Sequence, residues 1–122
     1  MNSKPEHTLE LAEEFFNVAS EELNRPEEDL VPYAVCRNAY LAVNNFMIGY
    51  LQQHGKEIHG TTSLEELVQQ CSEFNHNFMT LDLSNMYKSS EDVDVWMDLE
   101  TAKEYMDLAV QTRTFVSTVE VQ

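Results

Sequence analysis

The chain has 122 residues and a formal net charge of −15, from 22 acidic and seven basic side chains. Such a charge repels a phosphate backbone, so direct binding to nucleic acid is not expected. Three glycines, three prolines and a hydrophobic content of 43% disfavour both an all-β fold and a disordered chain. We therefore expect a single helical domain over residues 1–122, behind a polar N-terminal arm of about residues 1–5.

The first helix is predicted from about Pro5 to Leu23, because proline is tolerated in a first turn and glutamates favour the positive end of a helix. Its apolar side recurs in steps of three and four, with glutamates opposite: Leu9, Ala12, Phe16, Ala19 and Leu23. Residues 24–26 end this helix. Residues 27–31 either begin the next helix early or form a short turn.

The central predicted helix, Pro32 to Gly55, contains few charges. One apolar stripe at helical spacing is predicted to face the core: Tyr33, Cys36, Tyr40, Val43, Met47, Tyr50 and His54. A second stripe lies beside it and contains Leu41, Ile48 and Leu51, with Arg37 and Asn44 in line. Apolar residues cover much of the circumference, so this helix should be the most buried one. Gly55 can adopt the left-handed conformation that ends a helix.

Two more helices are predicted. Ser63 and Glu66 form a capping box that starts a half-length helix, whose inward residues are Leu64, Leu67, Cys71, Phe74 and Phe78. An irregular connection over residues 80–90 has room for a short helical turn around residues 83–87. The last helix is predicted over about residues 92–119, with its core side at Val95, Leu99, Ala102, Met106, Ala109, Arg113 and Val116. These elements predict an all-α, up-down four-helix bundle.

The two cysteines, Cys36 and Cys71, fall on apolar stripes and form no CxxC pair. Thiols in such a setting stay protonated, so we expect small buried side chains in a reducing compartment and no cysteine nucleophile. The N-terminus lacks the apolar region of an export signal, and no run of 18 apolar residues is present. A cytoplasmic protein without a membrane span is therefore expected.

Three of the four histidines are candidate metal ligands. Glu73 and His76 have the Glu-x-x-His spacing that di-iron four-helix proteins use twice, but the sequence has no second such pair. His76 also lies about 200° around a helix from Phe74, away from the predicted core side. His54 and His59 flank the turn at Gly55, without evident third and fourth ligands. We therefore expect no metal ion and no cofactor.

Two arginines interrupt apolar stripes, Arg37 in the central helix and Arg113 in the last one. In one interpretation, each side chain lies at the edge of the bundle with its stem on the core and its head in water. In the other, the guanidinium groups bind an anion in a cleft. The candidate ligand-binding residues are then Arg37, Asn44, His59 and Arg113.

The last helix carries many acidic residues, which we interpret as a solvated outer face: Asp92, Asp94, Asp98, Glu100, Glu104 and Asp107. A protein partner of such a face should present a basic surface, and salt should weaken the association.

The order of these features resembles the HEPN family, small four-helix-bundle domains of prokaryotes that are often encoded beside minimal nucleotidyltransferases. The resemblance covers about residues 33–119. It consists of an alanine-rich and aromatic central helix (YAVCRNAYLAVNNFMIGYL), a loop histidine before a leucine-rich helix (GKEIHGTTSLEELV), and a tyrosine-containing connection into a long final helix (NMYKSSEDVDVWMDLETAKEYMDLAVQTRTFV).

Ribonuclease members of this family carry an arginine on the final helix, followed after four to six residues by a histidine. The first such position after Arg113 is Thr118, and no histidine follows His76. The resemblance therefore implies a non-catalytic bundle. In the family, such bundles dimerise, bind a nucleotidyltransferase partner, or bind a nucleotide-like ligand between helices.

The sequence thus favours a HEPN-like binding module, homodimeric, that associates with a minimal nucleotidyltransferase or a nucleotide-like ligand. Two alternatives stay open. One is an enzyme, either a ribonuclease or a metal-dependent hydrolase that uses His54, His59 and His76. The other is an acidic interaction protein that occludes the basic surface of a nucleic-acid enzyme.

Overall fold

The computed structural model describes residues 4–59, 62–86 and 97–117. These residues form the helices α1 (Pro5–Leu23), α2 (Pro32–Gln53), α3 (Leu64–Phe74) and α5 (Leu99–Ser117), and the 3₁₀-helix η1 (His76–Thr80). Residues 84–86 are also helical, within the predicted short turn, and no strand occurs in the described ranges. The predicted all-α fold class is therefore confirmed.

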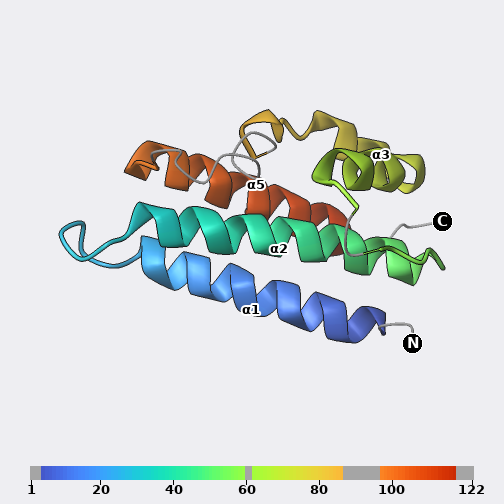
Figure 1. Cartoon of the computed structure of the whole chain (residues 1–122), viewed down its shortest axis with the longest axis horizontal. Helices are drawn as coiled ribbons and strands as arrows, with labels where there is room; N and C mark the ends of the chain where they lie inside the picture. The colour runs from blue at the N-terminus through green and yellow to red at the C-terminus, as the bar shows by residue number, and fades with distance from the viewer. Residues whose placement is uncertain (1–3, 60–61, 87–96, 118–122) are drawn as a thin grey trace.

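Helix α2 lies between α1 and α5 (Figure 1). Helix α1 runs antiparallel to it, so that Leu9 near the start of α1 approaches Gly49 near the end of α2. Helix α5 runs in the same direction as α2, and α3 with η1 covers the C-terminal end of α2 (Figure 1). Two of the three longest helices thus bury their apolar sides on the third.

The predicted bounds of α1 are confirmed. Pro5 occupies the first helical turn, and Asn24 caps the C-terminal end. The link to α2 is a turn, closed by a hydrogen bond from the Asp29 amide to the carbonyl of Pro26 at 2.9 Å. Residues 27–31 therefore form a short turn, and the second helix does not begin early.

Helix α2 is the most buried helix of the described chain, as its composition predicts. Ten of its residues are buried, against five in α5 and three in α1. Its last helical residue is Gln53, and the chain leaves the helix as predicted at Gly55, whose φ is 81°. The Lys56 amide donates to the Leu51 carbonyl and the Gly55 amide to the Gln52 carbonyl, both at 3.0 Å. This pair of bonds is the Schellman motif, which a left-handed glycine allows.

The predicted core stripe of α2 is correct from Cys36 to Tyr50 and wrong at its two ends. Cys36, Val43 and Met47 are buried, but Tyr33 is 54% exposed and His54 is also exposed. The buried arc instead extends to residues that face α1 and α5: Val35, Ala39, Ala42, Phe46 and Gly49. This side of α2 has no continuous stripe of large apolar side chains, so the apolar spacing did not indicate it. It is buried because its small residues allow α1 to pack closely against α2.

The second predicted stripe faces outward for most of its length. Leu51 is buried, whereas Arg37 is exposed and Leu41, Asn44 and Ile48 are half-buried. We name this side the α2 outer face and define it as Arg37, Leu41, Asn44, Asn45, Ile48 and Gln52.

Helix α3 begins as predicted and ends earlier. The Ser63 hydroxyl accepts a hydrogen bond from the Glu66 amide at 3.2 Å. The helix stops at Phe74, because Asn75 is extended and its side chain accepts from the Asn77 amide at 3.0 Å. Phe78 is buried as predicted, but it lies in η1 and not in the same helix.

The last helix begins at Leu99 and not near residue 92. Met97 and Asp98 are not helical, and the Asp98 carboxylate accepts from the Thr101 amide at 2.8 Å, as a helix N-cap does. Val95 lies outside the described residues. The core side is confirmed at Ala102, Met106 and Ala109, which are buried.

No helix among the described residues is both long enough and apolar enough to cross a membrane.

Candidate functional site

The structure does not bring the four candidate ligand-binding residues together. Arg37 and Asn44 lie two turns apart on the α2 outer face. His59 is exposed in the loop that follows α2. Arg113 lies on α5 at the side that meets α1, where it contacts Glu13. The four residues therefore do not line one anion-binding cleft.

Arg113 is held by two residues of α1. Its Nε donates to Glu13 Oε1 at 2.7 Å, and its guanidinium carbon lies 5.1 Å from the centroid of the Phe16 ring. The side chain is 46% exposed, which matches an arginine at the edge of the bundle. Glu13 already neutralises this cation, so Arg113 is a link between α1 and α5.

Arg37 has a different setting. It is exposed, and its guanidinium makes no ion pair or hydrogen bond within the described ranges. It is also the only charged residue among the 22 residues of α2. Arg37 is therefore a cation that is available to a ligand or partner.

The rest of the α2 outer face is uncharged. Leu41 is half-buried and belongs to neither core cluster, so part of its apolar surface is presented outward. The Asn45 amide nitrogen donates to the Leu41 carbonyl at 2.8 Å, which fixes this side chain against its own helix. Gln52 Oε1 is buried by its own chain, and no hydrogen-bond partner for it lies among the described residues.

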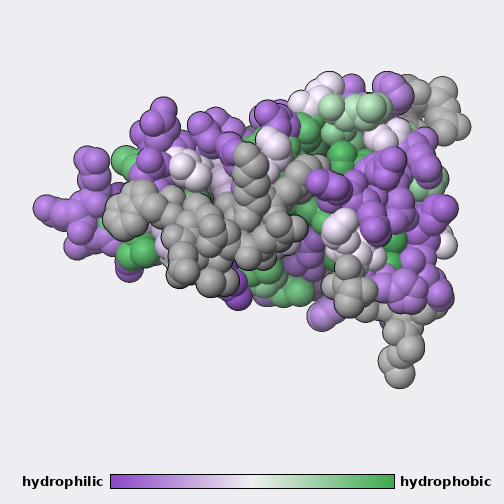
Figure 2. All heavy atoms as spheres, turned by 45° about the horizontal axis from the view of Figure 1, so that its top comes forward, coloured by the Kyte–Doolittle hydropathy of each residue, from purple (hydrophilic) through white to green (hydrophobic). Residues whose placement is uncertain are grey.

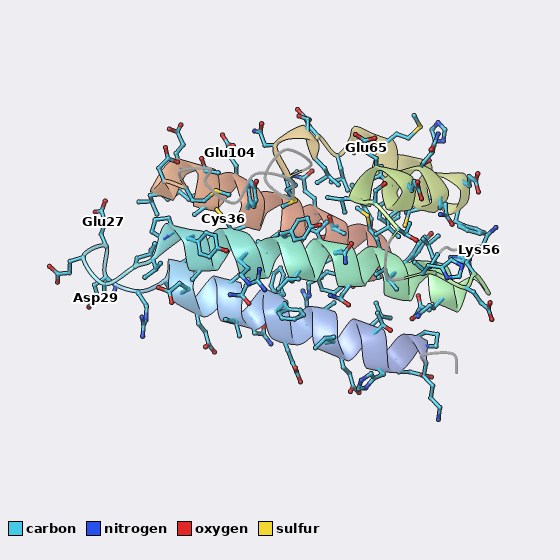
Figure 3. The ribbon with its side chains drawn as sticks, viewed as in Figure 1. Glu27, Asp29, Cys36, Lys56, Glu65 and Glu104 are labelled. Carbon is cyan, nitrogen blue, oxygen red and sulfur yellow. The ribbon has the colours of Figure 1, made fainter. Side chains whose placement is uncertain are left out.

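Acidic side chains lie elsewhere on the molecule. Figure 3 places Glu27 and Asp29 in the turn before α2, Glu65 on α3 and Glu104 on α5, each pointing outward. Hydrophilic side chains also cover much of the surface over α3 and α5, with apolar atoms between them (Figure 2). The α2 outer face, without a carboxylate, therefore contrasts with a chain whose net charge is −15.

The cysteines offer no nucleophile at neutral pH. Burial raises the pKa of Cys71 to about 12, and its Sγ lies 3.7 Å from the carbonyl oxygen of Met47. Burial and the nearby Asp98 carboxylate raise the pKa of Cys36 to about 12. Cys36 lies between α2 and α5 (Figure 3). Both thiols are protonated core side chains, as their positions on apolar stripes predict.

The histidines are dispersed. The His54 ring stacks on Phe74, with 4.2 Å between ring centroids. His76 begins η1, so the break at Asn75 separates it from Glu73 on α3. In the described part of the chain, no three histidine, cysteine, aspartate or glutamate side chains are grouped closely enough to hold a metal ion.

Sequence reasoning missed three residues that define this surface and its surroundings. Asn45 and Gln52 follow Leu41 and Ile48 at helical spacing, and this spacing could have placed them on the same side. The Glu13 partner of Arg113 lies 100 residues away in the chain, and no local pattern could have identified it.

Comparison with protein-family models, with curated proteins and with solved structures found no match for this chain. The α2 outer face is thus the candidate site on its geometry and chemistry alone.

Proposed function

We propose that this protein is a non-catalytic, HEPN-like binding module of the cytoplasm that acts as a homodimer. In this proposal the helices form an up-down four-helix bundle of the HEPN type. The observation that carries the proposal is the α2 outer face, which is partly apolar and free of carboxylates on an otherwise acidic chain. A surface of this kind is typical of a contact between proteins.

The acidic remainder of the surface supports a second partner of opposite charge. A protein with a basic patch, such as a minimal nucleotidyltransferase, would be attracted to the carboxylates of α3 and α5. This second association leaves the α2 outer face for the homodimer, so the two contacts are compatible.

A nucleotide-like ligand is the second candidate for the α2 outer face, and the exposed Arg37 favours it. A guanidinium without a carboxylate partner can bind a phosphate group. Arg113 is a poorer candidate because Glu13 already binds it at 2.7 Å.

Sedimentation equilibrium at micromolar concentration tests the homodimer. The expected mass is twice the 14.1 kDa of one chain. A monomer throughout the concentration range would contradict this part of the proposal.

Three further measurements separate the remaining candidates. Capture from a native lysate with the tagged protein should yield a nucleotidyltransferase, and washing with salt should remove it.

Titration with ATP should show weaker binding for Arg37→Ala than for Arg113→Ala, if the nucleotide alternative is correct. An RNA-cleavage assay with metal analysis should be negative, and stoichiometric bound metal or cleavage would favour the enzyme.

A further inference from the structure

A series of aromatic rings joins the C-terminal end of α2 to α3, η1 and α5. The His54 ring stacks on Phe74 of α3, with 4.2 Å between the ring centroids and 13° between the ring planes. Tyr50 lies edge-on to His54 at 4.6 Å and is 5.1 Å from Phe78 of η1. Phe78 in turn contacts Phe115 of α5 at 5.6 Å. Of these five rings, only the imidazole of His54 can gain a proton.

The end of α3 depends on this contact more than its beginning does. Helix α3 has 11 residues, and its buried side chains all lie among the first eight: Leu64, Leu67 and Cys71. Its last residue, Phe74, is half-buried and stacks on His54. The helix then stops, because Asn75 is extended. The stacked pair of rings therefore holds the last turn of α3 against α2.

The position of His54 favours a positive charge on its ring. His54 is the C-cap residue of α2, and the carbonyl end of a helix carries a partial negative charge. The face of the Phe74 ring also attracts a cation. The net charge of −15 adds a field of the same sign. Because His54 is exposed, its ring can exchange a proton with water.

We propose that protonation of His54 tightens the contact between α2 and α3, so that this joint responds to pH where an imidazole titrates. The imidazolium is attracted to the Phe74 ring and to the carbonyl end of α2, so the folded chain gains stability when it binds this proton. By linkage, the gain is complete at acidic pH and is lost as the pH rises and the ring becomes neutral.

Other titratable groups lie close to the two rings in the chain. They are Lys56, Glu57 and His59 in the loop after α2, Glu73 in α3 and His76 in η1. Within the described ranges, the side chain of His54 makes no ion pair or hydrogen bond with any of them. The stacked ring and the helix end are therefore the direct contacts through which a proton on His54 acts.

Helix α3 carries part of the acidic surface that we assign to a basic partner. The proton on His54 would then also set how firmly this surface is held on the bundle. This consequence rests on the proposed function, whereas the joint itself does not.

A double-mutant cycle at two pH values tests the joint. His54→Gln removes the site of protonation, and Phe74→Leu removes the ring but keeps an apolar side chain. Urea unfolding of the native chain, the two single variants and the double variant gives the coupling between residues 54 and 74. The coupling should be stronger at about pH 5.5 than at about pH 8, by about two- to fivefold in the equilibrium constant for unfolding. Equal coupling at the two pH values would overturn the inference.

Three further variants exclude other causes. His59→Gln, at a second exposed histidine five residues later, should show no coupling to residue 74 at either pH. Phe74→Tyr keeps an aromatic face and should retain the pH-dependent coupling to residue 54. Glu57→Gln combined with Glu73→Gln should also retain it. Loss of the coupling in this last variant would assign the effect to carboxylates and contradict the role of the ring.

Hydrogen exchange locates the effect in the structure. The Asn75 amide donates to the Cys71 carbonyl at 3.0 Å and reports on the last turn of α3. Its protection, corrected for the intrinsic exchange rate, should be greater at about pH 5.5 than at about pH 8 in the native chain and not in His54→Gln. An equal rise throughout α1 would place the pH response in the net charge and overturn the inference. A monomer in sedimentation contradicts the proposed homodimer and leaves this joint unaffected.

Discussion

Arg113 and Arg37 show how the same residue type acquires two roles from its surroundings. Arg113 has a carboxylate at 2.7 Å and an aromatic ring beneath it, both from α1. Arg37 has neither and lies on a face without acidic residues. An ion pair at this exposure contributes little to stability, because water and salt screen it. The stacking on Phe16 adds a contribution of similar size.

The two arginines therefore give a matched comparison. Arg113→Ala should lower the free energy of unfolding by about 1 kcal/mol, since it removes the ion pair and the contact with Phe16. Arg37→Ala should leave the stability of the monomeric form unchanged. Urea unfolding of each variant at low protein concentration measures both. Equal losses in the two variants would contradict the assignment of Arg113 as the link between α1 and α5.

The cysteines make stability depend on pH at the alkaline end. Burial raises the pKa of both thiols from the ordinary value of 9.0 to about 12, so the unfolded chain loses these protons first as the pH rises. The two protonated thiols therefore make their full contribution to the free energy of unfolding below pH 9. This contribution is lost progressively between about pH 9 and pH 12. Cys36→Ala with Cys71→Ala should reduce the slope over this interval, measured by urea unfolding at several pH values. A slope equal to that of the native chain would show that other groups cause the loss.

At the scale of elements, the packing of α1 on α2 depends on a close approach at Gly49. A Cβ placed on this glycine would lie 2.5 Å from Leu9 Cδ2. The approach is possible because neighbouring contacts are also made by small residues, Ala12 and Ala42, which are buried together with Phe46. A glycine in the interior of α2 lowers the stability of this helix, but its missing side chain permits the close contact with α1.

The effect of Gly49→Ala should therefore change sign with its neighbour. In the native chain the added methyl group overlaps Leu9, at a cost of about 1–3 kcal/mol, which exceeds the gain of about 1 kcal/mol in helix propensity. In a Leu9→Ala background the overlap is absent, and the same substitution should stabilise the protein. Thermal or urea unfolding of the native chain, the two single variants and the double variant gives a double-mutant cycle for residues 9 and 49. A stabilising effect in both backgrounds would show that Leu9 moves aside without cost.

At the scale of the whole molecule, the net charge of −15 acts on both folding and association. Repulsion within one chain opposes the compact state, and repulsion between chains opposes the proposed association of two copies. Both effects are screened by salt, but they can be measured separately because only association depends on protein concentration.

Salt should therefore raise the melting temperature of the monomeric chain. Low protein concentration keeps any association out of the measurement. The melting temperature of the chain should increase between low ionic strength and physiological ionic strength, where the screening length falls to about 8 Å. Differential scanning calorimetry is the direct measurement. A decrease would mean that attractive pairs such as Arg113 with Glu13 outweigh the net repulsion.

The sequence by itself determined the helical class, the bounds of α1, the end of α2 at Gly55 and the start of α3 at Ser63. These features depend on local signals, namely proline in a first turn, a left-handed glycine and a capping side chain, and such signals act within a few residues. The end of α3 and the start of α5 were predicted wrongly because the apolar spacing continued past Asn75 and before Asp98, whose side chains cap new helices. Local capping overrode the spacing there.

Only the tertiary structure decided which side of α2 is covered. Helical spacing identifies apolar stripes, but a helix that is apolar on most sides does not specify where its neighbours pack. The close approach at Gly49 draws α1 onto one side, α5 and α3 occupy the next, and the stripe with Arg37 and Asn44 stays outward. The partner of Arg113 was decided in the same way, because a contact between residues 13 and 113 exists only once α1 and α5 lie together on α2.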